Sequence, residues 1–420
     1  MIETIQLLPG IVLRCCPDDR FKQACLSIAI VRPMCRREAS ANALLPAVLL
    51  RGTRQYPDLR AITMRLDDLY GAAVGTQVRR IGDYQTTGLY CGFMEEKYAL
   101  DGDRVIEPMA DFLRQLLLDP VLENDGFCAD FVAGEKRNLL SAMEAQRNDK
   151  RLYAAEKLME HMCREDSFGI PRLGQKEDVQ ALNGKNLYDH YRKILRESQI
   201  ELFYVGASSA ETVAALVRPI FLQLERDYRP LPPQSAFRGA EGSRHTETMD
   251  VAQGKLCMGF VTPVTLRDPD FVPMQVFNTL YGSSMTSKLF MQVREKLSLC
   301  YDIGSSYHGS KGIISVAAGI DCAQEQTVRA EVLRQLEECR LGHFTQQEFN
   351  AARQALLSSL RSIHDTPGSI ENFYATAALS GLPLTPQQYM QAVSQVQPED
   401  VARVAQTVQL HTEFFLKGVQ

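Results

Sequence analysis

The sequence predicts an α+β protein made of two similar halves, each a sheet packed with helices. Three observations carry this prediction. Four segments recur in the same order in the two halves of the 420 residues. Apolar runs of strand type open the chain, and long helical patterns follow them. The length itself suggests more than one domain, at roughly 100–200 residues each.

The repeats indicate a duplication. "LDDLYGAAVGTQVRRIGDYQTTGLYCGF" from Leu66 matches "REKLSLCYDIGSSYHGSKGIISVAAGI" from Arg294, each with the pattern helix end, loop, strand, turn around glycine, strand. Three further pairs keep the same order: "MADFLRQLLLDP" with "RAEVLRQLEECR", "FVAGEKRNLLSAMEAQRND" with "FNAARQALLSSLRSIHDT", and "IELFYVGA" with "TEFFLKG". Single matches of apolar pattern are common, but four in register point to two copies of one domain.

Local signals define the individual elements. "TIQLLPGIVLRC" consists of two apolar runs about a Pro-Gly turn, which predicts a hairpin. "QACLSIAIVRP" is rich in β-branched residues and ends at Pro33, as a strand does. The stretch from Gly126 to Arg164 has helical spacing, with an interruption near Asn148–Asp149.

The halves are separated by a segment without apolar periodicity. "RDYRPLPPQSAFRGAEGSRHTE", residues 226–247, is rich in proline, glycine and charge, which is typical of a linker. We therefore expect an N-terminal domain over residues 1–225 and a C-terminal domain over residues 248–420.

Composition excludes some classes of function. The net charge is −5, from 46 basic and 51 acidic residues, so a nucleic-acid or anionic-membrane surface is not expected. Eleven cysteines are scattered without a CxxC pair, which fits a reducing cytoplasm. The N-terminus lacks a basic segment before its apolar run, so we expect no signal peptide, and no stretch approaches the 18 apolar residues of a membrane span.

The segment "ANALLPAVLLRGTRQYP" carries the first functional signal. Its frame resembles the active-site helix of the insulinase/pitrilysin peptidases, or inverzincins, in which H-x-x-E-H precedes a basic-Gly-Thr turn. In that family two histidines at i and i+4 bind zinc and the glutamate activates the zinc-bound water. Aligned on Arg51-Gly52-Thr53, these three positions are Ala43, Pro46 and Ala47 here. None of them has a donor atom.

The third zinc ligand of the family is also missing. It is the second of two glutamates seven residues apart on a later helix, which matches "GEKRNLLSAMEA". The first glutamate is kept as Glu135, but Ala142 occupies the ligand position. Without zinc we expect Glu135 to be a solvated helix charge paired at i,i+4. "EHMC", at Glu160–Cys163, is weak as a substitute site, so we expect no metal and no cofactor in this chain.

The second half keeps a different feature. "YGSSMTSKLFMQVREKLSLCYDIGSS" is similar to the family segment in which a Gly/Ser-rich turn precedes an arginine and a tyrosine that contact substrate. Arg294 and Tyr301 match that pair. Arginine can bind a carbonyl or carboxylate, and a tyrosine hydroxyl can donate to a developing oxyanion. The resemblance therefore implies a substrate-binding role for both, while a surface arginine and a half-buried strand tyrosine is the structural alternative.

The resemblance covers nearly the whole chain. It implies two homologous domains, each with a mainly antiparallel sheet and helices, that close as a clam-shell. In smaller members two chains form a heterodimer, one bringing HxxEH and the other the Arg/Tyr pair. We therefore expect a non-catalytic, substrate-binding subunit of a cytoplasmic zinc peptidase, with zinc on a partner chain and a peptide substrate, inactive alone.

A narrower likeness adds a context. "LLPAVLLRGTRQYP", "LDDLYGA" and "EKRNLLSAMEAQRNDKRLYA" are similar to bacterial pseudo-peptidases associated with aminopentanol modification of elongation factor P. This implies a role in peptide processing or protein maturation. Two alternatives remain open: a scaffold without any hydrolytic role, and a peptide-binding homodimer.

Overall fold

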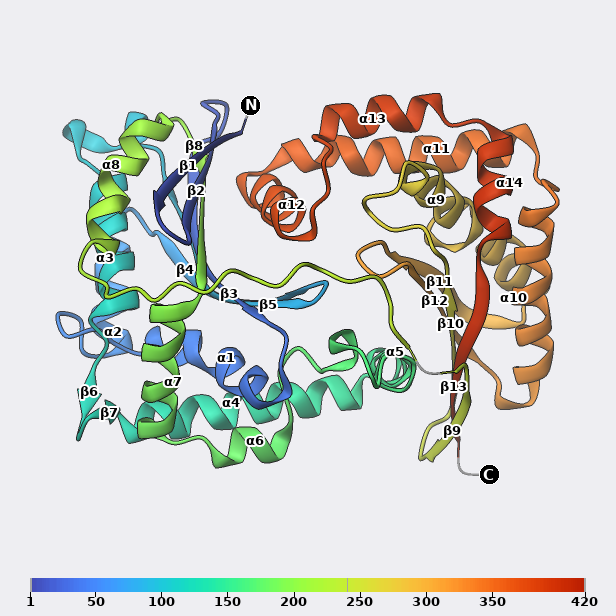
Figure 1. Cartoon of the computed structure of the whole chain (residues 1–420), viewed down its shortest axis with the longest axis horizontal. Coiled ribbons are helices and arrows are strands. Elements are labelled where there is room, and N and C mark those ends of the chain that lie inside the picture. The colour runs from blue at the N-terminus through green and yellow to red at the C-terminus, as the bar shows by residue number, and fades with distance from the viewer. Residues whose placement is uncertain (1, 240, 419–420) are drawn as a thin grey trace. The chain divides into compact units, whose positions relative to one another are not determined.

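The computed structural model describes residues 2–239 and 241–418, and it divides the chain into two compact units (Figure 1). Unit 1 comprises Met1–Met143, Pro171–Pro233 and His364–Thr376, and unit 2 comprises Glu144–Ile170, Gln234–Ile363 and Ala377–Gln420. Within the described residues, no helix has the length and apolar character needed to cross a membrane.

Unit 1 is organised around a six-stranded sheet. Its strand order is β1 (Glu3–Leu8), β2 (Ile11–Pro17), β8 (Gln199–Gly206), β3 (Gln23–Pro33), β5 (Tyr84–Met94) and β4 (Ala73–Ile81). β2 and β8 pair in parallel, whereas the other neighbours pair antiparallel. The helices before the chain first leaves the unit are α1 (Arg36–Leu49), α2 (Leu59–Asp68), α3 (Ile106–Leu118) and α4 (Ala129–Asn148), and a small β6–β7 hairpin (Leu122–Glu123, Gly126–Phe127) precedes α4. α6 (Lys176–Ala181), α7 (Gly184–Glu197) and α8 (Ala210–Phe221) follow.

Unit 2 contains a five-stranded sheet. The strand order is β11 (Cys300–His308), β12 (Ile313–Ile320), β10 (Gly254–Val261), β13 (Gln409–Gly418) and β9 (Arg244–Met249). Its helices are α5 (Lys150–Met162), α9 (Phe271–Asn278), α10 (Glu325–Arg340), α11 (Gln346–Arg361), α13 (Pro386–Gln395) and α14 (Pro398–Gln406). Two π-helical segments, Thr279–Ser283 and Leu289–Lys296, follow α9.

The duplication is visible in the strand order. Strands β2, β8, β3, β5 and β4 of unit 1 correspond in order to β9, β13, β10, β12 and β11 of unit 2. The parallel pair is conserved in place, because β13 and β9 also run parallel. The predicted fold class, two homologous halves with mainly antiparallel sheets and helices, is confirmed. The clam-shell arrangement of the halves stays a prediction.

The local predictions also agree with the elements. Pro9 and Gly10 form the turn between β1 and β2, and Gly10 has a φ of +72°, which favours glycine. The predicted helix interruption lies between α4 and α5, where the Asp149 side chain accepts hydrogen bonds from the backbone N–H of Arg151 and Leu152. An aspartate at this position satisfies N–H groups that have no partner inside the helix.

The compact units are not continuous in sequence. α5 follows α4 in the first half of the chain but packs against β10, β12 and β13 of unit 2. The start of α12 (Pro367–Ser380), which follows the equivalent helix α11 in the second half, belongs to unit 1. Each half of the chain thus supplies one helix segment to the unit built mainly by the other half.

The exchanged segments cover apolar faces of the sheets. In unit 2, Leu158 and Met162 of α5 pack in one cluster with Cys257, Phe414 and Leu416 of the sheet. In unit 1, the α12 residues Ile370 and Tyr374 pack with Cys25, Phe203 and Val205. The opposite face of the unit 1 sheet is covered by the larger core cluster, to which α1, α3 and α8 contribute.

A buried carboxylate fixes each exchanged segment. Glu371 of α12 is 1% exposed; it accepts a hydrogen bond from Ser27 Oγ at 2.8 Å and pairs with Arg79 at 2.9 Å. In unit 2, Asp166 follows α5 and pairs with Lys311 Nζ at 2.8 Å, with side-chain exposures of 3% and 0%. Because a charge is costly to bury alone, each pair ties its segment to one position.

The predicted linker, residues 226–247, contains no described helix or strand before Arg244, where β9 begins. β9 pairs with β13 and therefore forms the edge of the unit 2 sheet.

The Asp166–Lys311 pair gives a stability prediction. Asp166→Ala removes the carboxylate that pairs with the buried Lys311 Nζ and the acceptor for the backbone N–H of Phe168. We expect a loss of about 3–5 kcal/mol in the free energy of unfolding, measured by denaturant titration. The exposed pair Arg104–Glu107, with side-chain exposures of 62% and 59%, is the control, since Glu107→Ala should cost less than about 1 kcal/mol. Equal effects of the two substitutions would contradict the role of the buried pair.

The exchange also predicts how fragments behave. Residues 1–225 alone lack the α12 segment that covers Phe203 and Val205, and residues 248–420 alone lack α5. We expect neither fragment to unfold cooperatively, because each exposes a contiguous apolar face. Calorimetry of the two fragments beside the full chain checks this. A cooperative transition of the 1–225 fragment at the temperature of the full chain would refute it.

Candidate functional site

The helix with the zinc-motif frame is α1, and it is an apolar, buried element. Ala43 is 7% exposed, Pro46 is buried and Ala47 is half-buried. Leu44, Leu45 and Val48 belong to the unit 1 core. The three positions that would carry the two histidines and the glutamate therefore present no polar side-chain atom.

Pro46 stands inside α1, where a proline removes the hydrogen bond to the carbonyl four residues earlier. That carbonyl belongs to Asn42, and it accepts a hydrogen bond from Thr87 Oγ1 of β5 at 2.5 Å instead. A buried carbonyl without a partner would be costly, so β5 compensates for the proline. The helix therefore continues through Pro46, although a proline at the glutamate position of the motif cannot activate a water.

A buried polar chain fixes α1 to its neighbours. The Asn42 side chain, 1% exposed, donates to Gln85 Oε1 of β5 at 2.9 Å. His190 Nε2 of α7 lies 2.7 Å from Asn42 Oδ1, an acceptor, so this nitrogen carries the proton. Gln85 in turn donates to the carbonyls of Ala39 and Arg172. This network gives α1 a defined position that does not depend on metal.

Burial is the main influence on the ionisation of His190. It lowers the pKa of His190 from 6.5 to about 4, and the nearby charges of Arg32 and Lys193 act in the same direction. Glu38 opposes the shift but does not reverse it. The imidazole is therefore neutral in the folded protein at neutral pH, as its role in the network requires.

The predicted state of Glu135 is partly wrong. Glu135 is 9% exposed rather than solvated, and it pairs with Arg51 at 3.3 Å, not with a residue four positions away. Asn138 donates to its second oxygen at 3.1 Å. The guanidinium of Arg51, just before the Gly-Thr turn, thus supplies the counter-charge of Glu135. This contact joins distant segments, so the spacing within the helix could not predict it. Ala142 is exposed on the same helix.

The described residues contain no group of three or more His, Cys, Asp or Glu side chains able to hold a metal ion. The weak candidate at Glu160–Cys163 forms no such group either. His161 stacks on His245 with ring centroids 3.8 Å apart, and Cys163 is buried in the cluster that α5 forms with the unit 2 sheet.

Arg294 and Tyr301 lie together in unit 2. Arg294 is in the π-helical segment Leu289–Lys296, and Tyr301 is the second residue of β11. Both line one open hollow of about 550 Å³, together with Glu295, Cys300 and Asp321. Sequence pattern placed Arg294 at a helix end and Tyr301 on the next strand, and the structure agrees.

The local backbone aims both side chains outward. Tyr301 sits at an irregularity in the β11–β12 register, because Cys300 faces Ile320 and Asp302 already faces Gly319. A bulge of this kind re-aims a side chain, and Tyr301 is 59% exposed. The Arg294 guanidinium lies 4.6 Å from the centre of the Phe290 ring and 3.8 Å from Glu295, with 40% of its side chain exposed. Both groups are thus accessible from solvent.

Three exposed apolar side chains that the sequence analysis did not predict lie close to Arg294 and Tyr301 in sequence. Met285, Met291 and Leu297 are 78%, 44% and 45% exposed, all within the twenty-one residues between Tyr281 and Tyr301. Exposed methionines and aromatics gather on surfaces that bind other chains. The signal in the sequence was the Gly/Ser-rich stretch at Gly282–Ser284, where the first π-helical segment ends at Ser283.

Comparisons with known proteins agree with this geometry. Residues 181–356 match the family model described as the peptidase M16 inactive domain. The probable inactive metalloprotease YmfF of Bacillus subtilis is 28% identical over 411 residues, 98% of this chain and 96% of that protein. The chain is therefore similar to inactive peptidases of the M16 family. The predicted resemblance to the insulinase-type peptidases is confirmed.

Two solved structures share the fold over the full length. A conserved protein from Enterococcus faecalis V583 superposes with a TM-score of 0.92 at 25% identity, covering 100% of this chain and 99% of that one. A peptidase M16 inactive domain from Pseudomonas fluorescens gives a TM-score of 0.82 at 17% identity, with coverages of 100% and 98%. The second of these likenesses concerns the fold alone.

The neutral His190 predicts that the stability of this protein depends on pH. The pKa of His190 is lower in the folded chain than in the unfolded chain, so the unfolded chain takes up the proton first as the pH falls. The stabilisation is complete above pH 6.5 and is lost as the pH falls toward 4. Between pH 7.5 and pH 5 we expect a loss of roughly 2 kcal/mol from this residue.

Denaturant titrations of the wild type and His190→Gln at these two pH values isolate the effect, because glutamine keeps a donor for Asn42 but cannot ionise. The substituted chain should lose less stability on acidification than the wild type. The same pH slope in both proteins would show that His190 ionises as freely as in the unfolded chain.

Proposed function

We propose that this chain is the substrate-binding, non-catalytic subunit of a zinc metallopeptidase whose metal site lies on a partner chain bearing HxxEH. One contrast carries the proposal. The positions of the zinc motif, Ala43, Pro46 and Ala47, are apolar and lie on a helix that packs into the core of unit 1, whereas Arg294 and Tyr301 are accessible to solvent and line one hollow.

The chemistry of the hollow suits a peptide. Arg294 offers a planar set of donors for a backbone carbonyl or a carboxylate. The Tyr301 hydroxyl can donate to the oxygen that becomes negative when a peptide bond is attacked. Met285, Met291 and Leu297 do not line the hollow, but they are exposed and close to Arg294 in sequence, so they offer apolar contact area to a longer bound segment. Binding and polarisation of a peptide need no further group from this chain.

The attacking water and the metal that activates it would come from the partner. In such a site zinc lowers the pKa of bound water and polarises the carbonyl, and this chain would contribute orientation and oxyanion stabilisation. The similarity to pseudo-peptidases linked with elongation factor P modification supports protein maturation in the cytoplasm as the context. The substrate would then be a peptide segment, for which the hollow of about 550 Å³ offers an open binding surface.

A second candidate is a peptide-holding protein that acts without a zinc-bearing partner, as a scaffold or a homodimer. The exposed apolar residues near Arg294 favour it equally, because they suit any bound chain. The two candidates differ in one respect: only the first requires that Tyr301 affect the rate of peptide hydrolysis in a reconstituted pair.

The test is peptidase kinetics of the chain with its HxxEH partner. We expect Tyr301→Phe to lower kcat by about a hundredfold, since one oxyanion donor is lost, and Arg294→Gln to lower kcat/KM by at least about tenfold. Tyr98→Phe and Arg361→Gln remove the same groups from exposed positions elsewhere and should change neither value.

Assembly with the partner and thermal stability should be unchanged in all four variants, because each side chain is exposed. Activity that remains at the wild-type level in both Tyr301→Phe and Arg294→Gln would rule out the substrate-contacting role and leave the peptide-holding or scaffold function.

A further inference from the structure

A second cavity in unit 2 has a lining of one charge sign. It has a volume of about 210 Å³ and is formed by four segments that are distant in sequence. The first is Gln234–Ala236, where the chain enters unit 2 for the second time, and the second is the β10–α9 loop with Arg267. The other two are the β11–β12 turn with Gly309 and Ser310, and Ser380 at the end of α12. Arg267 is the one ionisable side chain in this lining, so the cavity is electropositive.

The Arg267 guanidinium has no carboxylate partner among the residues that the structure describes. The nearest acids along the chain are engaged elsewhere. Asp268 accepts hydrogen bonds from the backbone N–H and the hydroxyl of Thr265, and Asp270 pairs with Arg403 at 2.5 Å. The loop therefore neutralises its own carboxylates and leaves the arginine uncompensated.

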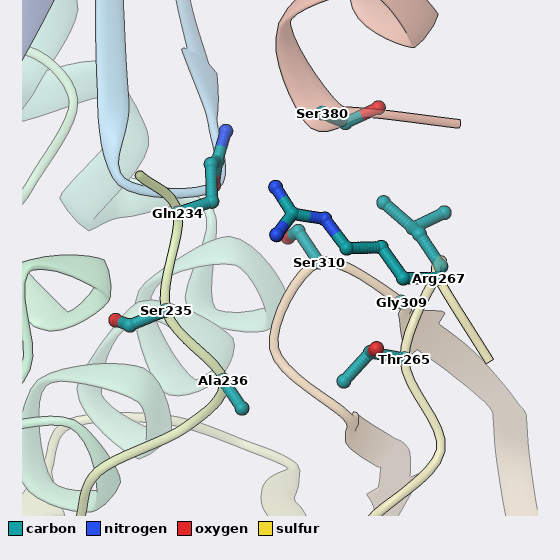
Figure 2. Close-up of a pocket in the computed structure, with 9 residues that line it drawn as sticks. Gln234, Ser235, Ala236, Thr265, Arg267, Gly309, Ser310 and Ser380 are labelled. Atoms are coloured by element: carbon teal, nitrogen blue, oxygen red, sulfur yellow. The ribbon is translucent and has the colours of Figure 1, made fainter. Parts of the chain in front are cut away.

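The side chain is nevertheless held in place. A Cβ built on Gly381 would come 3.4 Å from Arg267 Nε and 3.5 Å from Nη2, so the guanidinium packs against the backbone just after α12. Gly381 has a φ of +79°, which favours glycine and keeps this surface flat. Figure 2 shows the Arg267 side chain extended across the cavity, with its guanidinium pointing toward the segment of Gln234.

A hydroxyl group completes the lining near the guanidinium. Figure 2 shows Ser310 next to the Arg267 guanidinium, whereas the Ser235 hydroxyl points away from it. Ser235 Oγ instead accepts a hydrogen bond at 3.4 Å from Lys311 Nζ, whose charge is balanced by Asp166. An anion in the cavity would thus meet the planar donor set of Arg267 and the hydroxyl of Ser310.

We propose that this cavity is a binding site for a small oxyanion of the carboxylate or phosphate class, held by Arg267 with Ser310. The volume accommodates roughly seven water molecules at about 30 Å³ each, which is enough for such a group and a short attached chain. The site is distinct from the Arg294–Tyr301 hollow, shares no lining residue with it and does not depend on the proposed peptidase role.

Calorimetric titration of the full chain tests the proposal with two probes. Inorganic phosphate represents one source of the anion. A short glycine-rich peptide with a free C-terminus represents the other, and the same peptide with an amidated C-terminus is its control. We expect at least one of the two anionic probes to bind, and binding to weaken as salt is added. The tighter probe identifies the source.

Arg267→Gln should weaken that binding by at least about tenfold, and Arg267→Lys should restore only part of it, because lysine keeps the charge but loses the fork. Arg361→Gln, at the exposed end of α11, is the matched control and should bind like the wild type. Arg267 and Arg361 are both exposed, so all three variants should fold like the wild type. Failure of both anionic probes to bind the wild type, or equal affinity of wild type and Arg267→Gln, would overturn the proposal.

Discussion

Two buried carboxylates determine how this chain is built. Asp166 and Glu371 lie on the segments that the two halves exchange, and each meets a cation supplied by the unit that receives it, Lys311 and Arg79. Apolar contacts alone would let a covering helix slide along a sheet, whereas a buried ion pair with hydrogen-bonded oxygens accepts one position. Through Lys311, Asp166 also contacts the β11–β12 turn, and Lys311 donates in turn to Ser235 in the lining of the cavity.

The two halves differ in their polar side chains: α1 lacks zinc ligands, whereas the second half has an exposed arginine and tyrosine. α1 no longer has the side chains of a zinc helix, yet Thr87, Gln85 and His190 hold it by hydrogen bonds that replace any need for metal. Arg51 now neutralises Glu135, the surviving acid of the old motif. These contacts hold α1 and α4 in unit 1 without a metal ion. The second half keeps an irregular, π-helical and bulged segment whose arginine and tyrosine remain open to solvent.

Much of the fold was predictable from the sequence, because its signals are local. The Pro-Gly hairpin, the helix interruption at Asp149 and the paired repeats each depend on residues close in the chain. The exchange of α5 and α12 was not predictable, since an apolar helix face does not specify which sheet it covers, and the contacts of both segments join residues distant in sequence. For the site, the absence of zinc ligands and the location of Arg294 and Tyr301 could be taken from motif spacing. The burial of Glu135 and the cavity at Arg267 could not, because both arise from contacts between distant segments.

In the proposed assembly this chain binds peptide and the partner binds zinc. Elemental zinc analysis of the chain purified from its own cells, with the accompanying proteins identified by mass spectrometry, distinguishes the two roles. We expect about one zinc per complex, found only where an HxxEH-bearing chain is present, and none in this chain after separation. Stoichiometric zinc that stays with the isolated chain would show that this chain itself binds the metal.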